Sequence, residues 1–356
     1  MSRITVLSIN DRIACFHSLK PFLFARDPSR FVFTNSAAWC LKKDRNDILV
    51  MVRLFIKPDF VDRELMRRLR TRYRRIAFFH DDAGGGIPRL EVLPFVDLFY
   101  SKALFRDRSL YSRRLYGKEL YSDFFHRKYG VADPDHRERP VIEDPTDLAK
   151  LRISWNIGIG DYPRGKLRQR IGVAATMALG FRAARQFYGR RSSPTDPVLA
   201  NKGLYPVHAR MGIPERPSIA FQRSLILERV EGHPAFLTGP VSQRRYNHEV
   251  AHSRITLSPF GWGELCLRDF EAVRAGSLLL KPDMGHLETW PDIFVPNETY
   301  VPFDWEARNL IPIAESFLPD EQSRRRIARR AFESYHDQLS GLEQRFESII
   351  AEIAGK

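Results

Sequence analysis

The sequence predicts an α/β protein of two domains, each organised around a doubly wound parallel sheet. Its 356 residues are enough for two domains with separate cores, and a hydrophobic content of 43% indicates a globular chain. Short apolar segments alternate with helical segments, as they do where crossover helices join parallel strands. Residues 48–55 are almost continuously apolar, which is typical of a strand covered on both faces.

In the N-terminal half, apolar runs bounded by turn residues mark the expected strands. These lie at residues 4–9, 31–34, 48–54, 75–80, 96–101 and from 151 onward. A basic helix is expected over residues 62–73, and a long basic helical stretch over residues 164–191. Residues 192–202 include Ser-Ser-Pro-Thr-Asp-Pro and are expected to link the two domains.

The alternation resumes in the C-terminal half, which predicts a second parallel sheet. Strands are expected at residues 205–210, 235–238, 254–257, 277–281 and 299–303, and helices at residues 218–231, 246–252 and 315–353. The stretch from 257 to 276 lies between two of these strands and carries most of the candidate site.

That stretch combines a strand end, a glycine turn and a helix. Pro259, Gly261 and Gly263 form the turn. The helix is expected to run from about Gly263 to Gly276, a residue suited to a left-handed C-terminal cap. Such a turn lets backbone N–H groups and the positive end of a helix approach a phosphate. Gly261 and Gly263 are therefore candidate phosphate-binding residues.

Three charged residues are expected on one face of this helix. At 100° per residue, Glu264, Arg268 and Glu271 fall within about 60° of one another. An arginine can hold a pyrophosphate with two hydrogen bonds, and a glutamate can accept from both hydroxyls of a ribose. The alternative is a ladder of salt bridges on a solvated helix. The adjoining glycine turn favours a binding site.

Three segments of this stretch resemble a known family. They are Ser258-Pro-Phe-Gly-Trp-Gly-Glu264, Arg268-Asp-Phe-Glu-Ala272 and Ala275-Gly-Ser-Leu-Leu-Leu-Lys-Pro282. Together they are similar to the donor-binding segment of GT-B glycosyltransferases, especially exostosin-like and bacterial family-1-like enzymes. The resemblance implies two Rossmann-like domains facing across a cleft. It also implies that Glu271 contacts the nucleotide ribose and that Arg268 faces the diphosphate.

The resemblance leaves the role of Glu264 and the stereochemistry open. Many retaining GT-B enzymes carry two glutamates separated by seven residues, whereas six residues separate Glu264 from Glu271. A basic residue near the first strand of the C-terminal domain often binds the diphosphate in these enzymes, and Arg210 and Arg223 are the candidates here. GT-B enzymes usually need no metal, so no metal or other cofactor is expected.

The implied domain organisation has three parts. Residues 1–195 would form the N-terminal, acceptor-binding domain. Residues 203–330 would form the C-terminal domain that binds the nucleotide-sugar. Residues 331–356 would form a helix that crosses back to the N-terminal domain.

A second segment with possible chemistry follows the strand at residues 75–80. Asp81 and Asp82 come directly after His80 and precede three glycines. Carboxylates at the C-terminal end of a parallel strand lie where ligands bind in open α/β sheets, so either could act as the general base toward an acceptor hydroxyl. The alternative is turn and capping chemistry. A metal site is not expected, because adjacent side chains on a strand diverge.

The charge of the chain favours an anionic partner. The net charge is +14 and the isoelectric point is near 9.9. Nucleic acid, an anionic membrane and phosphate-bearing substrates are the options. The basic stretch 164–191 could lie on a membrane or pack against the edge of the sheet. The apolar run 171–181 spans about 16 Å as a helix, too short to cross a core of about 30 Å.

Compartment and function follow from these observations together. Three cysteines without a Cys-x-x-Cys pair fit a reducing cytosol, and no N-terminal signal is apparent. We expect a cytoplasmic glycosyltransferase, peripheral at the inner face of the cell membrane. It would move a sugar from a nucleotide-sugar donor to a glycan or lipid-linked acceptor, a lipopolysaccharide or polysaccharide precursor. The alternatives are a basic nucleic-acid-binding protein and a non-catalytic nucleotide-binding protein. No RNP, helix-turn-helix or zinc-finger pattern supports nucleic-acid binding.

Overall fold

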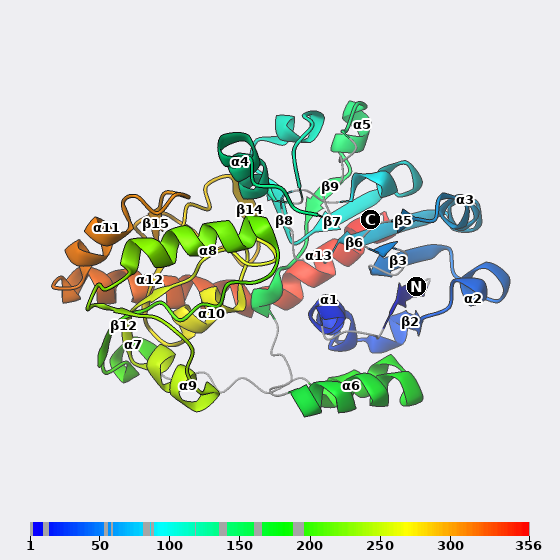
Figure 1. The fold of residues 1–356 in the computed structure, drawn as a ribbon. Coiled ribbons are helices and arrows are strands. Elements are labelled where there is room, and N and C mark those ends of the chain that lie inside the picture. Colours follow the sequence, from blue (N-terminus) through cyan, green and yellow to red (C-terminus); the bar gives the residue numbers. More distant parts are fainter. Residues whose placement is uncertain are drawn as a thin grey trace.

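The computed structural model describes residues 3–9, 14–52, 56–57, 60–80, 86, 89–117, 119–134, 141–159, 166–187 and 196–355. Figure 1 shows two lobes, each with its own sheet, and a pair of C-terminal helices that runs from one lobe to the other.

The N-terminal lobe contains a six-stranded sheet. Its strands are β1 (Ile4–Ser8), β2 (Phe31–Thr34), β3 (Ile48–Val52), β6 (Arg75–His80), β7 (Leu98–Ser101) and β9 (Leu151–Ile153). They follow the order β2-β1-β3-β6-β7-β9, and every neighbouring pair is parallel. Leu49 and Met51 contribute to one core, whereas Val50 and Val52 contribute to another. The strand is therefore covered on both faces, as its apolar sequence predicts.

Shorter elements surround this sheet. The helices are α1 (Ala14–Leu23), α2 (Ala37–Lys42), α3 (Arg63–Arg72), α4 (Leu120–Tyr129), α5 (Pro145–Leu148) and α6 (Lys166–Leu179). The 3-10 helices are η1 (Pro28–Arg30), η2 (Leu90–Phe95), η3 (Arg108–Ser112), η4 (Ile157–Ile159) and η5 (Phe181–Phe187). The remaining short strands are β4 (Ile56–Lys57), β5 (Phe60–Val61) and β8 (Ala103–Phe105).

The C-terminal lobe contains a second parallel sheet, of five strands. These are β10 (Tyr205–His208), β11 (Phe236–Leu237), β12 (Ser253–Leu257), β13 (Leu278–Pro282) and β15 (Val301–Phe303), in the order β11-β10-β12-β13-β15. The other elements are α7 (Pro197–Ala200), α8 (Pro217–Val230), α9 (Gln243–Ala251), α10 (Leu267–Arg274), β14 (Leu287–Thr289), α11 (Leu310–Phe317), α12 (Glu321–Ser340) and α13 (Leu342–Ala354). The two parallel-sheet α/β domains that the sequence predicts are therefore present.

The two lobes share one hydrophobic core. Phe78 and Phe99 of the N-terminal sheet belong to the same buried cluster as Phe260, Phe270 and Leu279 of the C-terminal lobe. The lobes are also joined by backbone pairing, because β14 pairs antiparallel with β8. These contacts make the junction an apolar and partly hydrogen-bonded interface.

The C-terminal helices cross from one lobe to the other (Figure 1). Helix α12 packs against α10 and β13, whereas α13 packs against α1 and β6. The ring of Phe346 on α13 meets that of Phe22 on α1 edge to face at 5.1 Å. A break at Gly341 separates the two helices.

Several predicted boundaries are wrong, and local backbone chemistry explains each difference. The stretch 164–191 is not one helix, because Gly180 has φ +85° and separates α6 from η5. The stretch 315–353 falls into parts of three helices, with Pro319 before α12. Helix α9 begins at Gln243, where the Ser242 hydroxyl accepts from the Arg245 N–H as a cap. No helix in the described part of the chain has the length and apolarity to traverse a membrane.

Candidate donor-binding site

The glycine turn lies between β12 and α10, at the carboxyl ends of the C-terminal strands. The Gly261 N–H donates to the Gly263 carbonyl at 3.0 Å, which closes the turn. Tyr121 of α4 donates its hydroxyl to the Gly261 carbonyl at 2.8 Å. The turn therefore lies at the junction of the two lobes, where a ligand could touch both.

Helix α10 begins four residues later than predicted, at Leu267. Cys266 is its N-cap, and the Asp269 carboxylate accepts from the Cys266 N–H at 2.9 Å. This reciprocal cap ends the turn and starts the helix. The predicted C-terminal cap is confirmed, because Gly276 has φ +64°. A Cβ at Gly276 would lie 2.4 Å from the Pro197 carbonyl oxygen, so only glycine fits there.

A buried ion pair supports the turn from below. Lys281 Nζ lies 3.0 Å from Asp269 Oδ1, and both side chains are fully buried. The Ser258 hydroxyl donates to the same carboxylate oxygen at 2.5 Å. The Lys281 ammonium also lies 5.2 Å from the Phe260 ring centroid. Asp269 thus connects strand β13, the turn and the first residues of α10.

Arg268 holds the ends of two strands together. Its Nη2 donates to the Arg210 carbonyl at 2.6 Å, just after β10, and its Nη1 donates to the Leu257 carbonyl at 3.5 Å. Its Nε donates to the Tyr246 hydroxyl at 3.1 Å. The guanidinium is therefore fixed at the carboxyl ends of β10 and β12, where ligands bind in this type of sheet.

Glu271 is exposed and is linked to Arg268 through Tyr246. The Tyr246 hydroxyl lies 3.5 Å from Glu271 Oε2, a weak donor contact. In the part of the chain that the structure describes, no ion pair joins Arg268 to Glu271, so the alternative salt-bridge ladder does not form. The ribose and diphosphate contacts that the resemblance implies for Glu271 and Arg268 stay predictions.

Glu264 does not lie on the helix face with Arg268 and Glu271. It precedes the helix and is fully buried, and its Oε1 is 3.7 Å from His286 Nε2. The prediction that Glu264 shares a helix face with Arg268 and Glu271 is wrong, because α10 starts after Glu264. Glu264 instead faces the segment that leads into β14.

Arg210 forms an ion pair with the buried carboxylate of Glu249. Its Nε and Nη2 donate to Glu249 at 2.8 and 3.0 Å, and its Nη1 donates to the Thr238 carbonyl. The hydrogen bond from Arg210 holds the pKa of Glu249 below its usual range. Next to them, burial lowers the pKa of His208 to about 4, so this histidine is neutral at physiological pH.

Arg223 of α8 lies against the glycine turn. Its Nε and Nη2 each donate to the Phe260 carbonyl at 3.2 Å, and its Nη1 donates to the Gly212 carbonyl at 2.7 Å. Burial lowers the pKa of this guanidinium somewhat. A Cβ at Gly261 would lie 3.5 Å from Arg223 Nη2. Arg223 therefore places positive charge beside the turn.

Sequence reasoning missed several residues of this region. Tyr246 joins the two predicted ligand contacts, yet it reaches them from another helix and has no local motif. Arg216 is buried between the lobes, with its Nε 2.9 Å from Asp133 Oδ2 and its guanidinium 5.9 Å from the Trp262 ring. Trp262 is 59% exposed in the glycine turn. The sequence does mark Lys281 as unusual, because it is a lysine within an otherwise apolar strand.

The predicted catalytic residues Asp81 and Asp82 lie outside the described residues. The described strand β6 ends at His80, which is buried. Among the described residues, no group of three or more His, Cys, Asp or Glu side chains is suited to hold a metal ion. Metal independence remains a prediction.

Comparison with known proteins gives one family and several distant structures. Residues 223–351 match the family model described as "Glycosyl transferase-like". No curated protein sequence matches the chain. The resemblance to GT-B, family-1-like glycosyltransferases is borne out by this match, whereas its exostosin-like part is not tested.

Three solved structures illustrate the structural similarity. Anabaena Alr3699/HepE in complex with UDP has 10% identity and a TM-score of 0.48, and the alignment covers 98% of this chain and 100% of that chain. A UDP-forming α,α-trehalose-phosphate synthase from Burkholderia vietnamiensis has 12% identity, 99% coverage of each chain and a TM-score of 0.43. An α-glucosyltransferase in complex with UDP has 9% identity, covers 99% of this chain and 100% of that chain, and has a TM-score of 0.46.

Proposed function

We propose that this protein, whose residues 223–351 are glycosyl transferase-like, moves a sugar from a nucleoside diphosphate sugar to a glycan acceptor. The donor would bind the C-terminal lobe at the glycine turn, and the acceptor would bind the N-terminal lobe. The observation that carries the proposal is the Arg268–Tyr246–Glu271 chain at the carboxyl ends of β10 and β12. It lies inside the matched segment.

The residues of this site suit departure of a diphosphate. Arg268 offers a fixed guanidinium, and Arg223 places a second one beside the turn. Such preorganised donors stabilise the negative charge that develops on the leaving group, without needing a metal. Glu271 would hold the ribose, and Asp81 or Asp82 would accept the proton of the acceptor hydroxyl.

Two substitutions on α10 test the donor site. Glu271→Ala should weaken nucleoside and nucleoside diphosphate alike, because both contain the ribose. Arg268→Ala should weaken the diphosphate and spare the nucleoside. Because a hydrogen bond to a charged group is worth about 1.5–3 kcal/mol, each affinity should fall by about 10-fold to 150-fold. Titration calorimetry with both ligands measures these changes.

The controls lie at the far end of α8. Glu228→Ala and Arg229→Ala remove the same charges from exposed positions and should leave both affinities unchanged. The nucleobase of the donor is identified first, by a thermal-shift screen of UDP, GDP, CDP and TDP. A ligand at 100 times its Kd adds about 2.7 kcal/mol of stability. If the α10 variants bind like the parent, the donor site is elsewhere.

Salt-dependent RNA binding without any nucleotide response would favour the nucleic-acid-binding alternative.

We further propose that the acceptor is a cell-surface glycan precursor, lipopolysaccharide or polysaccharide, reached at the cytoplasmic face of the membrane. Helix α6 and η5 support this. Leu167, Ile171, Met177 and Leu179 are exposed, at 50–78% of their surface. The segment 166–187 contains five basic residues and no acidic one. Exposed apolar side chains among arginines are typical of a helix that lies in an anionic membrane surface.

Removing the arginines of this surface should release the protein from anionic vesicles. Each lysine or arginine near such a surface contributes about 1 kcal/mol, and salt screens the contribution. The test variant changes Arg168, Arg170, Arg182 and Arg185 to Gln, and flotation with anionic and neutral vesicles measures binding. The control changes Arg325, Arg326, Arg329 and Arg330 of α12 to Gln, which removes the same charge. Equal binding to neutral and anionic vesicles would contradict the proposal, as would equal loss in both variants.

A further inference from the structure

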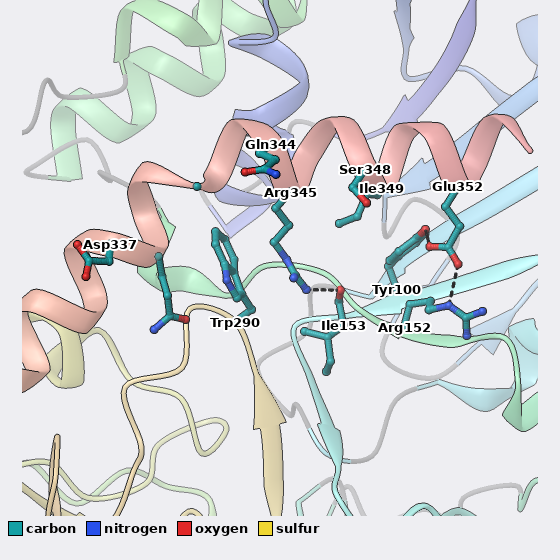
Figure 2. Close-up of a pocket in the computed structure, with 12 residues that line it drawn as sticks. Tyr100, Arg152, Ile153, Trp290, Asp337, Gln344, Arg345, Ser348, Ile349 and Glu352 are labelled. Carbon is teal, nitrogen blue, oxygen red and sulfur yellow. Dashed lines mark hydrogen bonds and ion pairs between the residues drawn. The ribbon is translucent and has the colours of Figure 1, made fainter. Parts of the chain in front are cut away.

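A cavity of about 480 Å³ lies apart from the glycine turn, where the two lobes meet the crossing helices (Figure 2). Three parts of the chain line it. Tyr100, Arg152 and Ile153 come from the N-terminal sheet, and Trp290 follows β14 in the C-terminal lobe. The third part is a stripe of α12 and α13 that includes Gln344 and Ser348. A volume of this size falls in the range of small-molecule sites.

The charges in this cavity balance. Two arginines and two carboxylates line it, Arg152 and Arg345 with Asp337 and Glu352. Arg152 Nε pairs with Glu352 Oε1 at 2.7 Å, and the Tyr100 hydroxyl donates to Glu352 at 2.6 Å. The cavity therefore has no excess of positive charge that would select a phosphate, unlike the proposed donor site.

Arg345 is fixed between the lobes. Its Nη2 donates to the Ile153 carbonyl at 2.8 Å and its Nε to the Ser154 carbonyl at 3.0 Å. Its guanidinium lies 4.8 Å from the Trp290 ring centroid, and Figure 2 shows the two side chains next to each other. The Trp290 ring thus lies beside a guanidinium that is hydrogen-bonded to two backbone carbonyls.

The rim offers hydrogen-bonding groups to solvent. Asp337, Gln344 and Ser348 are exposed along one stripe of the helices, and Figure 2 shows Gln344 and Ser348 on the helix above Trp290 and Tyr100. A carboxylate, an amide and a hydroxyl together donate and accept hydrogen bonds. An uncharged ligand with many hydroxyls and apolar C–H faces matches a balanced cavity with aromatic rings.

We propose that this cavity binds a neutral saccharide at a site separate from the proposed donor site. The proposal does not depend on transfer activity, because it rests on the lining of this cavity alone. Its chemistry excludes the nucleotide as occupant, since no net positive charge is available for the diphosphate.

Binding of neutral glycans to the full-length protein tests the proposal. An array of neutral and anionic glycans gives the first survey, and saturation-transfer NMR with maltose, cellobiose, lactose and diacetylchitobiose follows in solution. Ser348→Trp places a large ring in the cavity from an exposed helical position and should abolish the signal. Gln344→Ala should weaken binding about two- to tenfold, the worth of one hydrogen bond between neutral groups.

Glu333→Trp, at another exposed position of α12, is the matched control and should bind glycans like the parent. All three variants should keep the nucleotide response of the parent, which separates this proposal from the donor site. If the protein binds none of the neutral glycans, the proposal is overturned. Preference for anionic glycans, or an undiminished signal in Ser348→Trp, overturns it as well.

Discussion

Asp269→Ala is expected to lower the free energy of unfolding by about 3–5 kcal/mol, because Lys281 would remain charged and unpaired in the core. The two side chains are fully buried and 3.0 Å apart. Ser258 and the N–H of Cys266 would lose their acceptor at the same time. The loss should therefore exceed that of an exposed ion pair, which is about 0–1 kcal/mol.

Urea denaturation of three variants measures this effect. Asp269→Ala should be the least stable, and Asp269→Leu combined with Lys281→Met should recover much of the loss, since it removes both charges. Glu321→Ala breaks the exposed pair with Arg325 and is the control. A loss below about 1 kcal/mol in Asp269→Ala would show that water reaches Lys281. In that case Asp269 does not organise the glycine turn.

Asp81→Asn or Asp82→Asn is expected to lower turnover by about 10²- to 10⁴-fold, the usual contribution of a general base. Strand β6 lies inside the N-terminal sheet, between β3 and β7, and ends at His80. In the sequence both aspartates follow His80 directly, and ligands bind at the carboxyl ends of parallel strands in open sheets. Nucleotide affinity should be unchanged, because the donor would bind the other lobe.

Steady-state rates and titration calorimetry on the same preparations separate these effects. Asp47→Asn, just before β3 at the opposite end of the sheet, is the control and should keep full turnover. Unchanged turnover in both Asp81→Asn and Asp82→Asn would reject the general-base role. A parallel loss of nucleotide affinity would instead place the carboxylates in the donor site.

Local patterns were sufficient for most of the fold. Apolar runs such as Ile48–Val52 mark buried parallel strands, because a strand covered on both faces needs apolar side chains at every position. Gly276 marks the end of α10, because the left-handed backbone there favours glycine. The segment from Ser258 to Pro282 carries the glycosyltransferase resemblance, which the family match bears out.

The start of α10 was beyond local reasoning. The prediction placed it near Gly263, which would have aligned Glu264 with Arg268. In the structure Asp269 caps Cys266 and also pairs with Lys281, so the helix begins at Leu267. The buried lysine that fixes this carboxylate comes from the next strand, and helical periodicity contains no such information.

By itself, the sequence determined the α/β class, the two sheets and the segment that carries Arg268 and Glu271, because these depend on residue type and spacing along the chain. Tertiary structure alone decided which side chains meet. Tyr246 reaches Arg268 from α9, β14 pairs with β8 across the lobes, and Arg210 is taken up by Glu249. Contacts between segments far apart in the chain depend on how the sheets and helices pack, which no local pattern encodes.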